Sequence, residues 1–214
     1  MSKWGIEEKE TIEAINNIGF SGNILNIAAG DGRFNNRLLE LSDSVTAIDI
    51  DNSELESLEK NCPKDLLDKL YTKAVDITQK LPFLDETFDG VFCTGTLHLF
   101  DRDTIIKILQ EIKRVLKTKG KIVLDFATDI KRLDKNQNQV VFEGEGNYTT
   151  DEAVSLFEEQ LKEFSLNIEV ATFMEENLED DAGYNYISGN FLIISGIARE
   201  KSINKKHQQG CIER

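Results

Sequence analysis

Two short segments in the first quarter of the chain carry residue types that can hold a nucleoside-containing ligand. The first is Ala29-Gly30-Asp31-Gly32-Arg33, whose two glycines allow a sharp turn and a close approach of backbone to a ligand. The second is residues 47–50, which place Asp49 at the carboxyl end of an expected strand. A carboxylate there can accept hydrogen bonds from the hydroxyls of an adenosine ribose.

The spacing of the glycines separates two kinds of adenosine ligand. The dinucleotide-binding pattern G-x-G-x-x-G uses its last glycine for close helix packing beside a pyrophosphate. Here that position is Asn35, and the bulky Phe34 precedes it. A ligand that contains adenosine but no pyrophosphate therefore fits better, and a nucleotide-dependent oxidoreductase remains as an alternative.

An alternation of expected strands and helices positions these segments. An amphipathic helix over residues 6–18 comes first, and later helices begin near Arg33, at Asn52 or Ser53, and at Asp103. The expected strands are residues 23–28, 45–50, 71–75, 88–94 and 121–126. Such alternation implies right-handed crossovers, and so predicts an α/β fold with a doubly wound, Rossmann-like and mostly parallel sheet.

The last third of the chain follows a different pattern. Thr149 and Glu152 have the spacing of a capping box and predict the start of a helix. Two extended segments, residues 166–173 and 191–198, have no helical pattern between them, so they are expected to pair as an antiparallel hairpin at one sheet edge. The polar residues 131–148 are expected to form a loop over one end of the sheet.

Length and charge limit the classes of protein that fit. A chain of 214 residues predicts one domain, over residues 1–199, followed by a polar tail over 200–214. The formal net charge of −14 makes a nucleic-acid partner unexpected, because a protein that binds nucleic acid usually presents a basic face to the phosphates. No apolar run is long enough to span a bilayer, and no secretory signal is recognised, so a cytoplasmic protein without a membrane partner is expected.

Metal and disulfide chemistry are not expected. The three cysteines, Cys62, Cys93 and Cys211, form no CxxC pair and would remain thiols in a reducing compartment. The two histidines lie far apart in the sequence, and the carboxylates show no recognisable ligand spacing, so no metal site is predicted.

The sequence resembles the class I S-adenosylmethionine-dependent methyltransferases, especially their small-molecule group. Residues 24–32 resemble the glycine-loop motif of the family, and residues 47–50 resemble its ribose-binding segment. Asp76-Ile77 with the following residues to Val91 resembles the adenine-contacting stretch, and residues 111–121 resemble the family's helix–turn–strand. Four matches in the same order are more specific than any one of them.

The resemblance implies S-adenosylmethionine as the cofactor and suggests how it is held. Gly30 and Gly32 would approach the methionine part, where Ala28 stands in place of a common glycine. Asp49 would bind the ribose and Ile50 would cover one face of the adenine. Asp76 would receive the adenine amino group beside Ile77, and Thr94 would lie near the methionine amino group.

Two departures from the family pattern keep another reading open. Asn26 occupies a position that is often acidic, and Ala28 one that is often glycine. A non-catalytic protein that binds S-adenosylmethionine for regulation is therefore the alternative to an enzyme.

The expected methyl acceptor is a small molecule. Residues 94–97 lack the Asn- or Asp-Pro-Pro-Tyr motif of enzymes that methylate exocyclic base nitrogens. His98 is the candidate general base, since histidine ordinarily titrates near pH 6.5, although a packing role is its alternative. Asp129 and Arg132 are candidates for recognising a polar acceptor, and Tyr148, with Trp4, for covering the pocket.

Overall fold

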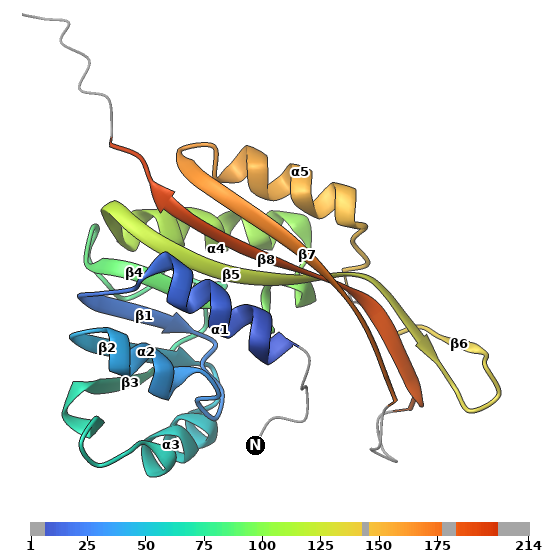
Figure 1. The fold of residues 1–214 in the computed structure, drawn as a ribbon, viewed down its shortest axis with the longest axis horizontal. Coiled ribbons are helices and arrows are strands. Elements are labelled where there is room, and N and C mark those ends of the chain that lie inside the picture. Colours follow the sequence, from blue (N-terminus) through green and yellow to red (C-terminus); the bar gives the residue numbers. More distant parts are fainter. Residues whose placement is uncertain (1–6, 143–145, 177–182, 201–214) are drawn as a thin grey trace, which may run out of the picture.

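A single mixed sheet organises the residues that the computed structural model describes, which are 7–142, 146–176 and 183–200 (Figure 1). The strands follow the order β3-β2-β1-β4-β5-β8-β7, and β6 pairs with β5 outside this path. The strands are β1 (Asn23–Ile27), β2 (Ser44–Asp49), β3 (Leu70–Ala74), β4 (Phe88–Cys93), β5 (Leu116–Leu133), β6 (Gln139–Val140), β7 (Phe164–Glu176) and β8 (Tyr186–Ala198).

Helices cover both faces of this sheet. They are α1 (Glu7–Ile18), α2 (Asn35–Leu41), α3 (Asn52–Asn61), α4 (Arg102–Val115) and α5 (Thr150–Gln160), with short 3₁₀ turns η1 (Leu67–Lys69) and η2 (Leu97–Leu99). Helices α4 and α5 bury their apolar stripes in the larger core cluster, and α1 and α2 pack in a second cluster. None of the helices in the described ranges is long and apolar enough to cross a membrane.

The strand directions confirm the predicted fold class. Strands β1 to β5 pair in parallel, as β2 with β1 and β3, and β4 with β1 and β5. Strand β8 is antiparallel to both β5 and β7, so the final strand is the reversed one and β7 forms the sheet edge. The carboxyl ends of β1, β2 and β4 therefore meet at one edge of the sheet, where ligands bind in open α/β folds.

Strand β5 differs most from its expected length. It begins at Leu116 and ends at Leu133, beyond both limits of the expected strand over 121–126. The loop expected over 131–148 is therefore wrong in part, because Arg132 pairs with Ile187 of β8 and with Val140 of β6. The polar residues of this segment hid a strand because they lack the apolar alternation by which strands are recognised.

The extra length of β5, β7 and β8 carries the sheet beyond the helices as a narrow arm that includes β6 (Figure 1). Other boundaries moved less: α2 begins at Asn35 rather than near Arg33, because the glycine loop continues through Phe34. The predicted capping box is present, with Thr149 and Glu152 bonding each other's backbone at the start of α5. Trp4 and residues 201–214 of the expected polar tail lie outside the described residues.

The loop between β1 and α2 turns through three residues with left-handed backbone. Ala28, Gly30 and Gly32 have φ values of 53°, 51° and 89°. Hydrogen bonds from Ala29 N to Ile48 O and from Gly32 N to Ala29 O, each 3.0 Å, hold the turn against β2. The two glycines serve different ends: a Cβ on Gly32 would lie 2.7 Å from Cγ of Leu58 in α3, whereas one on Gly30 would meet no atom within 4 Å.

Hydrogen bonds from Arg114 hold the segment between β3 and β4 against α4. The Arg114 guanidinium donates to Leu81 O at 3.0 Å and to Phe83 O at 2.8 Å. It also forms an ion pair with Glu111 at 2.7 Å, with both side chains about one-fifth exposed. Glu111 in turn accepts a hydrogen bond from Leu81 N, so the pair fixes the chain that follows Asp76 and Ile77.

The glycine loop predicts unequal costs for two matched substitutions. We expect Gly32→Ala to lower the free energy of unfolding by about 2–4 kcal/mol, because strain adds to overpacking against Leu58. Gly30→Ala should cost only about 1 kcal/mol, since only its backbone is strained. Urea unfolding measures both. Gly32→Ala should cost less in a Leu58→Ala background than in the wild type, because the crowding atoms are then absent. Equal losses in the two glycine variants would contradict the packing role.

The hydrogen bonds and ion pair of Arg114 predict that an Arg114 variant loses stability to a degree that depends on pH. Hydrogen bonding from Arg114 lowers the pKa of Glu111 in the folded chain, so ionised Glu111 stabilises the fold above its ordinary pKa, about 4.3. We expect Arg114→Gln to cost about 2 kcal/mol at neutral pH. This difference from the wild type should shrink as the pH falls through the lowered pKa. The control is Arg102→Gln, also in α4, which removes an exposed ion pair with Glu159 of α5 and should cost much less at every pH.

Candidate functional site

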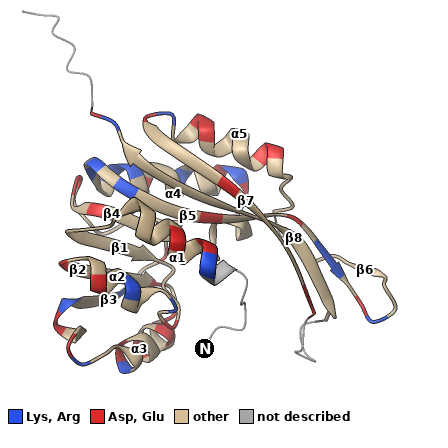
Figure 2. Ribbon diagram, viewed as in Figure 1, with Lys and Arg blue, Asp and Glu red and all other residues tan. Residues whose placement is uncertain are grey.

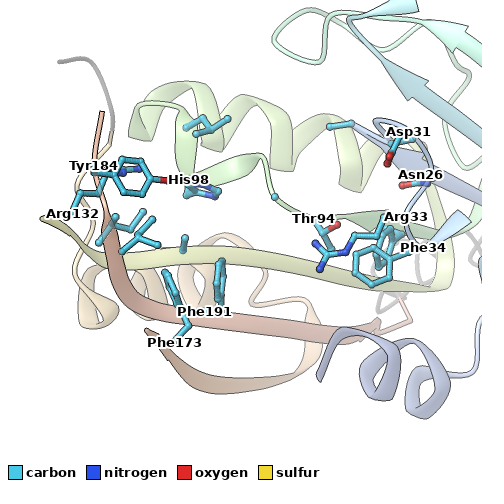
Figure 3. A pocket seen from close by; sticks show the side chains of 18 residues that line it. Asn26, Asp31, Arg33, Phe34, Thr94, His98, Arg132, Phe173, Tyr184 and Phe191 are labelled. Carbon is cyan, nitrogen blue, oxygen red and sulfur yellow. The ribbon is translucent and has the colours of Figure 1, made fainter. Parts of the chain in front are cut away.

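A cavity of about 390 Å³ opens beside the carboxyl ends of β1 and β4 and runs along β5 toward the arm. Figure 3 shows its labelled side chains in two groups. Asn26, Arg33 and Thr94 lie at one end, and His98, Arg132 and Tyr184 lie toward the other. The carboxyl ends of parallel strands thus do form a pocket, as the fold class predicts.

Asn26 and Arg33 form the end of the cavity nearest the glycine loop. Asn26 is 3% exposed, and its amide donates a 3.5 Å hydrogen bond to Oδ1 of Asn35, which is 1% exposed. The Arg33 guanidinium lies 5.1 Å from the centre of the Phe34 ring, which itself packs edge-on against Phe92. At this end of the cavity the Asn26 amide and the Arg33 guanidinium therefore lie beside the rings of Phe34 and Phe92.

Asp49 lies on the other side of the glycine loop, outside the cavity lining. Its Oδ2 accepts from Gly30 N at 2.9 Å and its Oδ1 from Asp51 N at 3.0 Å. The next residue, Ile50, leaves 73% of its apolar side chain exposed. The end of β2 thus presents a fixed carboxylate beside an uncovered apolar surface, as a ribose and an adenine face require.

Asp76 and Ile77 follow β3, next to the end of β2. The bond from Val75 N to Asp49 O, 2.8 Å long, ties the two strand ends together. Thr78 donates to Oδ1 of Asp76 through its hydroxyl and its amide, and these bonds hold the pKa of the carboxyl below its ordinary value. The Ile77 side chain is buried in the larger core cluster.

Thr94 and Gly95 follow β4 and line the cavity. Gly95 N donates a 2.7 Å hydrogen bond to Asp125 of β5, a carboxylate that is 1% exposed. Burial, followed by the Asp125 charge, raises the pKa of the neighbouring Cys93 thiol, so this cysteine stays protonated. The Asp125 bond fixes the loop on which Thr94 reaches the cavity.

His98 lies on the short turn η2 and lines the cavity, with its ring edge-on to Phe126 at a centroid distance of 6.3 Å. Tyr148 fastens this turn from behind, because its hydroxyl donates to Phe100 O at 2.9 Å and its ring packs edge-on against Phe126. Burial raises the pKa of Tyr148. Tyr148 is not part of the cavity lining, so it holds the His98 segment rather than facing the cavity.

Asp129 and Arg132, the two predicted acceptor residues on β5, are placed differently. Asp129 lies outside the cavity lining, and its Oδ2 accepts from the Thr150 hydroxyl at 2.7 Å and from Thr150 N at 3.0 Å. Hydrogen bonding from Thr150 lowers the pKa of Asp129. Arg132 lines the cavity, with its guanidinium 4.8 Å from the Phe142 ring centre and 5.5 Å from that of Tyr184.

The sequence did not reveal several residues of the cavity. Arg33 was expected to begin a helix, but the longer loop turns it into the cavity. Phe173 and Phe191 were expected only as strand residues, yet their rings stack at 4.5 Å and line the cavity wall. Only the pairing of β7 with β8 brings these two together, and no local pattern carries that information.

Within the described ranges, no group of three or more His, Cys, Asp or Glu side chains is arranged to hold a metal ion.

Curated sequences and solved structures include proteins that are similar to this chain. A tRNA U34 carboxymethyltransferase from Nautilia profundicola is 29% identical over 106 residues, which are 48% of this chain and 33% of that protein. This match therefore spans about a third of the length of the curated relative. The YcgJ protein from Bacillus subtilis superposes with a TM-score of 0.67 at 13% identity, over 90% of this chain and 100% of that chain.

A third relative is an S-adenosylmethionine-dependent methyltransferase from Methanosarcina mazei. It has a TM-score of 0.61 at 22% identity, and the superposition covers 87% of this chain and 97% of that chain. At these identities the solved structures establish the fold alone.

A methyltransferase domain family matches residues 25–124, which contain the glycine loop, Asp49, Asp76 and the strand that ends at the cavity. The matched segment, the reversed final strand and the site geometry agree. Over residues 25–124 the chain is therefore similar to methyltransferase domains, a family that implies S-adenosylmethionine as the cofactor.

Proposed function

We propose that this protein transfers a methyl group from S-adenosylmethionine to a small-molecule acceptor. The observation that carries the proposal is the division of the site by the glycine loop. Asp49 and Ile50 lie on one side of the loop, and the cavity with Thr94 and His98 lies on the other. A cofactor laid across Gly30 would leave its adenosine outside the cavity and point its sulfonium methyl into it.

The residues around the loop fit the two halves of that cofactor. Gly30 leaves open space where a side chain would stand, so backbone can approach the ligand closely. Arg33 supplies donors for the methionine carboxylate, and Thr94 lies close enough to the same end to meet the amino group. Ala28 keeps the left-handed turn at φ 53° without glycine, so its methyl group adds strain but does not close the loop.

The reaction itself needs little covalent chemistry from the protein. Methyl transfer from a sulfonium is an in-line displacement: the acceptor atom forms the new bond to carbon while the carbon–sulfur bond breaks, leaving the neutral thioether. The protein orients the acceptor and manages its proton. His98 lines the cavity and is suited to accept that proton from a hydroxyl or ammonium acceptor.

The shape and charge of the molecule favour a small acceptor. The cavity is lined mainly by apolar and aromatic side chains, as ligand pockets usually are. Figure 2 shows Lys and Arg gathered where α4 ends and β5 begins, far from the carboxyl-end edge. There Lys113, Lys117 and Lys119 pair with carboxylates at 3.2, 2.9 and 2.7 Å, so they do not form a bare basic face for phosphates.

Cofactor binding should depend on Asp49. We expect Asp49→Ala to weaken binding of S-adenosylhomocysteine about 10- to 100-fold, because hydrogen bonds to a charged group contribute about 1.5–3 kcal/mol. Calorimetry on the folded variants measures this. Asp51→Ala is the matched control: Asp51 caps α3 through Ser53, so its loss should reduce stability and leave affinity near that of the wild type. Equal affinity of Asp49→Ala and wild type would remove Asp49 from the site.

The acceptor class can be tested by following labelled methyl groups. We expect the protein to pass label from S-adenosylmethionine to the low-molecular-mass fraction of a cell extract, and not to purified tRNA, because the lysines gathered in the described residues pair with carboxylates and lie far from the carboxyl-end edge. His98→Gln should slow this transfer about 10²- to 10⁴-fold without changing S-adenosylhomocysteine affinity. Label found in tRNA alone would contradict the small-molecule acceptor, and an unchanged rate in His98→Gln would remove the general base.

A further inference from the structure

We propose that the end of the cavity around Arg132 is a carboxylate-binding subsite, so that the acceptor is an organic acid with a flat apolar body. The inference rests on the proposed function, because it specifies which small molecule the cavity takes. Three independent features support it: the route by which β5 brings Arg132 to the cavity, the rings that orient its guanidinium, and the apolar wall beside it.

A β-bulge turns Arg132 into the cavity. Up to Ala127, which lines the cavity opposite Phe191, β5 pairs regularly with β8. Strict alternation would bring Asp129 and Lys131 to that face next. Instead the register shifts between Thr128 and Lys131, so two residues of β5 oppose one residue of β8. Beyond this bulge Ile130 and Arg132 line the cavity.

Asp129 fixes the bulge through contacts with two other elements. It has left-handed backbone, with φ 52°, and its Oδ2 accepts from Thr150 of α5 and, at 3.3 Å, from Asn190 of β8. On β8 the facing residue is Gly189, where a Cβ would lie 2.8 Å from Thr128 O. The bulge is therefore held from both sides, and the predicted acceptor residue Asp129 acts by positioning Arg132.

Two aromatic rings orient the Arg132 guanidinium. Its central carbon lies 4.8 Å from the centre of the Phe142 ring and 5.5 Å from that of Tyr184, and these two rings meet edge-on at 6.0 Å. A guanidinium that lies over a ring still points its N–H donors outward in its own plane. Five donors in a fixed fork match the two oxygens of a carboxylate.

The wall between Arg132 and the cofactor end of the cavity is apolar. Phe173 and Phe191 stack at 4.5 Å with 28° between their planes, and Ile130, Ile187 and Leu99 complete this wall. Figure 3 places the two phenylalanines along the side of the cavity between the two arginines. A flat apolar body along this wall would have its carboxylate at Arg132 and its other end near Thr94.

The charge of the whole protein makes Arg132 necessary for such a ligand. With a formal net charge of −14, the molecule repels anions at long range, so an acid needs a local cation to enter. The neighbouring Lys131 is exposed and does not line the cavity. These two residues therefore have equal charge, adjacent positions and opposite placement, which makes Lys131 the natural control.

The experiment compares matched acids and amides on protein saturated with S-adenosylhomocysteine. The probes are benzoate, phenylacetate and 3-phenylpropionate with their three amides, and calorimetry gives each affinity. In the wild type we expect at least one acid to bind about 10- to 100-fold more tightly than its amide. Arg132→Gln should erase this preference, Arg132→Lys should keep part of it, and Lys131→Gln should leave it intact.

Other outcomes overturn the subsite. Acids that bind no better than amides at every length, including no binding of either, refute it, as does a preference that survives Arg132→Gln. Equal losses in Lys131→Gln and Arg132→Gln would show a long-range effect of charge instead. The S-adenosylhomocysteine titration is a separate readout, so failure to bind it counts against the proposed function, and the acid–amide comparison can be repeated without it.

Discussion

The hydrogen bond from Gly30 N to Asp49 joins the two strand ends on which the site depends. It requires β1 and β2 to lie in parallel and in register, and it requires the left-handed turn that starts at Ala28. This bond fixes the glycine loop between the end of β2 and the cavity. We propose that adenosine binds on the β2 side of this loop. The cavity lies on the β4 side, so one bond would set the geometry of both.

The far end of the cavity depends on a different kind of constraint. Parallel strands bring β1, β4 and β5 to a common edge, but a regular strand would point Arg132 away from the cavity. The bulge at Asp129 changes which β5 side chains point to the cavity side of the sheet. Strand β8 supplies Gly189 opposite the bulge and Asn190, which donates a hydrogen bond to Asp129. In the proposed function the common fold therefore holds the cofactor, and the arm built from β5, β7 and β8 determines which acceptor can lie beside it.

The sequence predicted the part of this structure that local patterns encode. Strand ends near Asp49 and Thr94, the capping box at Thr149 and the reversed final strand follow from periodicity and short motifs, and they are present. The arm could not be predicted from the sequence, because the end of β5 is polar and its bulge forms only through pairing with β8. For the same reason Asp129 and Arg132 looked equivalent in sequence, although only Arg132 lines the cavity.

The most direct test is a crystal structure of the protein with S-adenosylhomocysteine. The central claim is that the cofactor crosses the glycine loop between Asp49 and the cavity. The ribose hydroxyls should then bond the Asp49 carboxylate, the adenine should cover Ile50, and the sulfur should lie at the cavity between Thr94 and Arg33. Adenosine inside the cavity, or a ligand that makes no contact with Asp49, would contradict the account.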